Sequence, residues 1–84
     1  METVKDNKYI VPSLVSAGKI LRYLSSYRHN RATLGEISKK LDINKSTCYR
    51  ILLTLSDMKL LSYDSETKTY SLGHYLVVLG KRAE

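Results

Sequence analysis

The chain has 84 residues and one cysteine, so we expect a single domain with a small core and neither an internal disulfide nor a cysteine-based zinc site. It has no apolar run long enough to span a bilayer, and its start lacks the apolar segment of a secretory signal, so we expect a cytoplasmic protein. Hydrophobic residues make up 43% of the chain, enough for a globular fold, and the formal net charge of +6 favours a polyanionic partner.

Residues 1–10 mix charge and polarity and are predicted to be flexible, although residues 9–11 could already pack on the domain. Pro12 begins the first predicted helix, which ends near Tyr27. One face of this helix is apolar and consists of Leu14, Ala17, Leu21 and Leu24, with Ile20 beside them. Gly18 lies inside the helix at a cost of about 1 kcal/mol relative to alanine. A close backbone approach, for example across a dimer, would explain this glycine.

The segment from Arg28 to Arg31 is a basic polar loop. We favour a solvated connection as its role. The alternative is a phosphate clamp, in which Arg31 helps to position the protein on a duplex without reading its sequence.

Residues 33–55 predict two short helices joined by a tight turn. Thr33 and Glu36 have the spacing of a capping box, in which each side chain bonds the other residue's backbone N–H. Apolar side chains then recur on one face at Leu34, Ile37 and Leu41. Residues 42–44 form the turn, and Asn44 is a good N-cap for the next helix.

The second of these helices, residues 45–57, has one apolar face and one polar face. The apolar face consists of Cys48, Ile51, Leu52, Leu55 and Met58. Cys48 is therefore expected to be a small core residue rather than a nucleophile. The first two turns of the polar face offer hydroxyls and a guanidinium to base edges in a major groove, while the backbone N–H groups of the first turn favour phosphate. The alternative is an ordinary surface helix with a solvated polar face.

Residues 61–72 read as strand, turn and strand, and Leu61, Tyr63, Tyr70 and Leu72 are expected to share a buried face. A lone hairpin is unstable, so this one must pack on the helices. The predicted fold is therefore mainly α with a small β-hairpin, a winged helix-turn-helix over residues 11–73. Residues 67–69 near the tip of the wing could meet the DNA backbone or minor groove. Residues 74–84 are nearly apolar all round and predict the start of a linker or dimerisation helix.

From about Val11 to Leu79 the sequence resembles the N-terminal DNA-binding domain of the IclR family of transcription regulators. The resemblance is carried by Leu-Gly-Glu-Ile at 34–37, Lys-Ser-Thr-Cys-Tyr-Arg-Ile-Leu at 45–52, Thr-Leu at 54–55 and Tyr-Ser-Leu-Gly at 70–73. It implies a homodimer that binds a palindromic operator. It also implies a small-molecule effector that acts only through a larger C-terminal domain, which is absent from this sequence. The chain would then be a truncated regulator or an isolated reader domain, associated with the nucleoid.

Three residues depart from the family pattern. Asp42 stands where the family usually has glycine, and aspartate can adopt the left-handed conformation at modest cost. Lys59 replaces a glycine that commonly ends the recognition helix, so that end could be built differently. Leu53 replaces a small residue on the outer side of the helix. It could contact a thymine methyl or pack against the wing, and we favour packing.

The candidate DNA-contacting residues are Arg31, Lys45, Ser46, Thr47, Tyr49, Arg50 and Lys68. By the resemblance, Ser46, Thr47, Tyr49 and Arg50 contact the groove, and Lys45 contacts a phosphate or a base. Arg50 is the strongest candidate, because its guanidinium pairs bidentately with guanine or phosphate. Its alternative role is a salt bridge with Asp57 or Glu36. Tyr49 either reaches a phosphate or covers the edge of the core.

The chain shows no nucleophile–base pair, no phosphate-binding loop and no metal-ligand cluster, so we expect neither an enzyme nor a cofactor. The alternative to DNA recognition is a winged helix that binds another protein. Such a surface should present exposed apolar anchors. The region instead concentrates cations and hydroxyls against one acid, Asp42, in Lys39, Lys40, Lys45, Ser46, Thr47 and Arg50.

Overall fold

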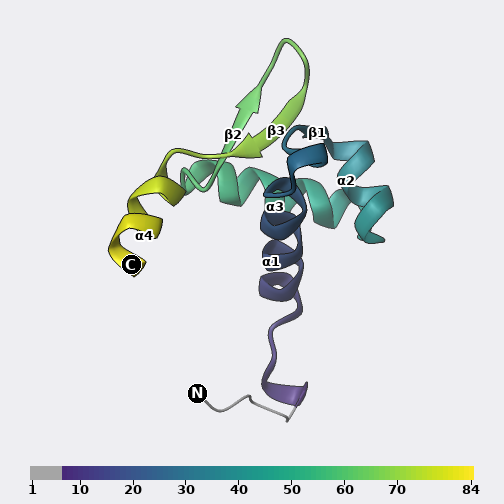
Figure 1. Ribbon diagram of the computed structural model, residues 1–84. Helices are drawn as coiled ribbons and strands as arrows, with labels where there is room; N and C mark the ends of the chain where they lie inside the picture. Colours follow the sequence, from purple (N-terminus) through teal and green to yellow (C-terminus); the bar gives the residue numbers. More distant parts are fainter. Residues whose placement is uncertain (1–6) are drawn as a thin grey trace.

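The computed structural model describes residues 7–84 and contains three helices, a small antiparallel sheet and a fourth helix that leads away from them (Figure 1). The helices are α1 (Pro12–Leu24), α2 (Leu34–Leu41), α3 (Lys45–Asp57) and α4 (Tyr75–Ala83). The strands are β1 (Ala32–Thr33), β2 (Leu61–Asp64) and β3 (Thr69–Leu72), and 3₁₀ turns span Asn7–Tyr9 and Tyr27–His29. This is the predicted winged helix-turn-helix.

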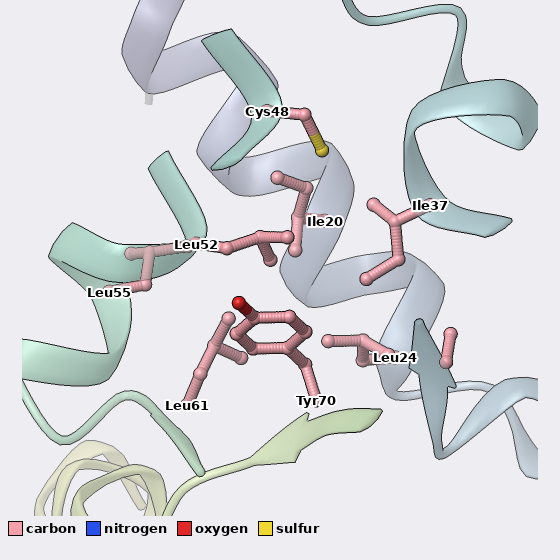
Figure 2. Close-up of a cluster of buried hydrophobic side chains, with 9 residues drawn as sticks. Ile20, Leu24, Ile37, Cys48, Leu52, Leu55, Leu61 and Tyr70 are labelled. Carbon is pink, nitrogen blue, oxygen red and sulfur yellow. The ribbon is translucent and has the colours of Figure 1, made fainter. Parts of the chain in front are cut away.

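The core lies where α1, α2 and α3 meet the base of the hairpin (Figure 2). Its buried side chains come from every predicted apolar face and are Ile20, Leu24, Ala32, Ile37, Cys48, Leu52, Leu55, Leu61 and Tyr70. Two residues assigned to those faces are instead exposed, Leu14 at 70% and Met58 at 54%. They lie at the first turn of α1 and just past the last turn of α3, where they line an open groove between the two helices rather than the core.

Helices α2 and α3 end in the same way, each with a non-glycine residue in the left-handed conformation. Asp42 has φ 54°, as the sequence predicted it could, and Lys59 has φ 66°. The N–H of Ile43 donates to the Ser38 carbonyl, and the N–H of Leu60 donates to the Leu55 carbonyl, each over 3.0 Å. The end of α3 is therefore a Schellman motif with lysine in the position that glycine usually takes.

The sheet has three strands in the order β1-β3-β2, one more than the sequence indicated. Strand β1 has two residues, too few to show the alternation that marks a strand. Tyr63 pairs with Tyr70 across β2 and β3, and Leu61 pairs with Leu72. The helices cover only Leu61 and Tyr70 and leave the other two more than a third exposed, so the predicted buried face is half right.

The N-terminal part of the chain differs from the prediction in three ways. Residues 9–11 are exposed rather than packed on the domain, and residues 1–6 of the predicted flexible segment lie outside the described residues. Helix α1 ends at Leu24 rather than near Tyr27 as predicted. Tyr27–His29 forms a separate 3₁₀ turn, and its His29 ring stacks on Tyr23. A Cβ atom at Gly18 would meet nothing within 4 Å, so no backbone of the described chain requires this glycine.

Candidate nucleic-acid interface

Asn44 holds the first turn of α3 in place. Its Oδ1 accepts hydrogen bonds from the N–H of Ser46 over 3.0 Å, from the N–H of Thr47 over 3.4 Å and from the Ser46 hydroxyl over 2.8 Å. This confirms the predicted N-cap. It also corrects one expectation, because two of the N–H groups proposed for a phosphate already have a partner. The Ser46 oxygen keeps its lone pairs and can accept from a base amino group.

The outward face of α3 is fixed by what its inward face buries. Cys48, Leu52 and Leu55 are buried against the other helices and the wing, so residues on the opposite side of the helix must face solvent. The candidate residues of the helix are all exposed, namely Lys45, Ser46, Thr47, Tyr49 and Arg50. All five candidates on α3 are therefore accessible, but they are spread around the helix. Thr47 and Arg50 line the groove between α1 and α3, whereas Tyr49 lies on the side of the wing.

Arg50 has no ion pair among residues 7–84, so the alternative role of a salt bridge with Asp57 or Glu36 is not observed in the described structure. Glu36 has another role, since its carboxylate accepts the N–H of Thr33 over 2.8 Å while Thr33 Oγ1 accepts the N–H of Glu36 over 3.2 Å. The first of these hydrogen bonds holds the pKa of Glu36 below its usual value. The capping box is confirmed, and the Arg50 guanidinium is left at the surface.

Arg31 lies beside the wing rather than beside α3. Its guanidinium pairs with Asp64 at 3.6 Å, where β2 ends and the turn of the hairpin begins. The Asp64 carboxylate also accepts hydrogen bonds from the N–H groups of Glu66 and Thr67. These hydrogen bonds lower the pKa of Asp64 more than the charge of Arg31 does. The exposed Lys68 closes the turn with φ 56°. Arg31 and Lys68 therefore both lie at the wing, where Asp64 and Glu66 offset their charge.

Tyr49 lies at the junction between α3 and the wing. Burial is the main cause that raises the pKa of Tyr70, and the neighbouring Tyr63 and Tyr49 raise it further. The Tyr63 and Tyr70 rings lie 4.7 Å apart, and Tyr49 itself is 47% exposed. Its side chain is therefore near the wing and accessible, and its contact with a phosphate stays a prediction.

Leu53 is 55% exposed, so at most part of its side chain packs against the wing as predicted. Helical spacing from the buried Leu52 and Leu55 places Leu53 on the outer side, and it is not among the side chains that pack against the core. Leu53 is not among the predicted DNA contacts, because the sequence analysis favoured packing for it.

Other kinds of site are not indicated in the described part of the chain. Residues 7–84 contain no group of three His, Cys, Asp or Glu side chains that could hold a metal ion. The same residues include no helix with the length and apolar character needed to cross a membrane. Cys48 is buried, and this burial raises the pKa of its thiol, which disfavours the reactive thiolate.

Comparison with known proteins identifies the same domain. The model of the IclR helix-turn-helix domain matches residues 13–65. An IclR transcriptional regulator from Alicyclobacillus acidocaldarius is 45% identical with a TM-score of 0.88, over 89% of this chain and 30% of that chain. HmgR from Pseudomonas aeruginosa is 25% identical with a TM-score of 0.74, over 87% and 31% of the two chains. No curated protein matches the chain closely enough to count as a relative.

An IclR family regulator from Brucella abortus shares the fold, with a TM-score of 0.84 at 23% identity over 99% of this chain and 31% of that chain. This chain therefore spans about a third of the length of the regulators that it resembles. These relatives are transcription regulators rather than enzymes. The family model covers more than half of the sequence, so the chain belongs to the IclR family of transcription regulators and carries its winged helix-turn-helix DNA-binding domain.

Proposed function

We propose that this domain reads a specific double-stranded DNA sequence, with α3 in the major groove and the β2–β3 hairpin as a wing on the flanking backbone or minor groove. The observation that carries the proposal is the orientation of α3. Burial of Cys48, Leu52 and Leu55 on one side leaves the guanidinium of Arg50 and the hydroxyl of Ser46 on the other side, facing solvent. The helix of a helix-turn-helix presents such residues to base edges.

The proposed contacts divide into two groups. Arg50 pairs with guanine or phosphate, and Ser46, Thr47 and Tyr49 contact groove edges or adjacent phosphates, with Lys45 on a phosphate or a base. Arg31 and Lys68 contact phosphates beside the wing and set the orientation of the domain without reading sequence. The net charge of +6 supports this second group, because cations that neutralise phosphates release counterions from the duplex.

We further propose that the regulator works in the cytoplasm as a homodimer on a palindromic operator. Its half-sites would then lie one helical turn of DNA apart or a multiple of it. Helix α4 supports a paired arrangement, since none of its side chains is buried although Tyr75, Val77, Val78 and Leu79 are large and apolar. A small-molecule effector would act through a further domain of the regulator.

Selection of bound sequences from a random duplex pool tests these proposals. We expect a palindromic motif, together with an affinity that falls steeply as the salt concentration rises. A single enriched half-site would support sequence reading and contradict the dimer. Absence of any enriched motif would contradict sequence-specific recognition, and the winged helix would then more closely fit a protein-binding module.

A further inference from the structure

The outward face of α3 contains one large aliphatic side chain in a polar setting. Ser46, Arg50 and Leu53 follow one another at i, i+4 and i+7, which places them in one row along the helix. Leu53 is 55% exposed. It therefore extends the row that the proposed function assigns to the major groove, one turn beyond Arg50.

More than half of Leu53 is open to solvent. It is absent from the side chains that pack against the core and from the walls of the groove between α1 and α3. Its neighbours Leu52 and Leu55 are buried, at 0% and 5% exposure. Turning α3 to hide Leu53 would bring those two side chains into water, so the exposure of Leu53 is set by the packing of the domain.

A leucine side chain has no hydrogen-bonding group, so in a major groove it can recognise only an apolar feature. The C5-methyl group of thymine is the apolar group that base pairs present there. We propose that Leu53 is a specificity-determining residue that contacts a thymine methyl in the operator. This inference rests on the proposed function, because it requires α3 to lie in the major groove.

The helix geometry also predicts where that thymine lies. Leu53 is three residues beyond Arg50, a rise of about 4.5 Å along the helix axis. Successive base pairs are spaced by about 3.4 Å. The thymine should therefore lie within two base pairs of the base or phosphate that Arg50 contacts.

The test uses the duplex obtained by selection and replaces its thymines with deoxyuridine one at a time, which removes only the methyl group. We expect one replacement near the Arg50 contact to weaken binding by the wild-type chain about fourfold, the effect of losing one buried methyl-sized group. The Leu53→Ala variant should bind the unmodified duplex more weakly and should be insensitive to that replacement. Val15→Ala, which truncates an exposed apolar residue of α1 outside the proposed DNA and dimer surfaces, should retain the wild-type sensitivity.

The two proposals fail in different ways. If wild type and Leu53→Ala lose equal affinity at every deoxyuridine, or if the selected motif has no thymine within two base pairs of the Arg50 contact, the role of Leu53 is overturned while sequence reading stands. If selection enriches no motif, sequence reading and the role of Leu53 are both overturned. Circular dichroism should show the same helix content in all variants, because Leu53 is not part of the core.

Discussion

Gly73 packs directly on the backbone of Lys59, where the wing returns to the end of α3. The N–H of Gly73 donates to the Leu60 carbonyl over 2.8 Å, and the N–H of Tyr75 donates to the Lys59 carbonyl over 3.2 Å. A Cβ atom at position 73 would lie 2.4 Å from the Lys59 carbonyl oxygen. The glycine is therefore required by this close approach rather than by a positive φ, which it does not have.

We expect Gly73→Ala to destabilise the domain by about 1–3 kcal/mol, because the methyl group must displace backbone rather than a flexible side chain. Urea unfolding followed by circular dichroism measures the loss. Gly18→Ala is the matched control, since the added Cβ meets nothing within 4 Å. It should stabilise the helix by about 1 kcal/mol. Equal effects of the two substitutions would contradict the steric role of position 73.

Lys59→Gly should stabilise the domain by about 1 kcal/mol, because a lysine at φ 66° bears the steric cost of the left-handed conformation. Asp42→Gly at the end of α2 is the comparison. Its gain should be smaller, since aspartate tolerates this conformation better than lysine. Paired urea titrations of both variants would show the difference, and a destabilised Lys59→Gly would mean that the lysine side chain contributes more than its backbone strain costs.

The capping box at the start of α2 predicts a pH-dependent contribution to stability. A hydrogen bond from the Thr33 N–H lowers the pKa of Glu36 below the unfolded value of 4.5. The stabilisation is therefore present above pH 4.5 and is lost as the pH falls through the lower pKa of the folded state. At neutral pH the free energy of unfolding should be larger for wild type than for Glu36→Gln. The two values should converge as the pH is lowered.

Substitution of Thr33, the other residue of the capping box, tests the box independently. Thr33→Ala should cost about 1 kcal/mol at neutral pH, because the N–H of Glu36 loses its acceptor. A constant difference between wild type and Glu36→Gln from pH 7 to pH 2 would show that the charge of Glu36 contributes nothing.

Arg50→Ala should leave the fold intact and weaken binding to the selected duplex by about 1–3 kcal/mol. The side chain is exposed and has no ion pair among the described residues, so its removal takes away no observed ionic contact. Fluorescence anisotropy at one fixed salt concentration measures the affinity. Arg22→Ala removes an equal charge from the last turn of α1 and should cost far less. Similar losses in the two variants would reduce the role of Arg50 to general charge.

The parts of the fold that local chemistry determines could be predicted from the sequence. The Thr33–Glu36 box, the Asn44 cap and the left-handed Asp42 each depend on residues within a few positions of one another. The buried positions of Leu24 and Leu52 followed from helical periodicity. In each case the interaction is encoded within one or two turns of the chain.

The predictions that failed depend on which element covers which. Leu14 and Met58 continue the apolar faces of their helices, but they line an open groove between α1 and α3 instead of the core. Tyr63 alternates correctly along β2 yet is 46% exposed, whereas Leu61 on the same strand is buried. The pairing of Arg31 with Asp64 joins residues far apart in the sequence, and no spacing rule signals it. The seven proposed DNA contacts stay predictions until binding is measured.

The burial of Cys48 gives the domain an internal reporter of its own opening. The chain has no other cysteine, and this thiol is fully buried on the inner side of α3. An alkylating reagent can reach it only when α3 separates from the core, so the labelling rate reports how often that happens. DNA that binds only the closed domain should slow the labelling in proportion to the bound fraction. Opening of the recognition helix can thus be timed without altering a single residue.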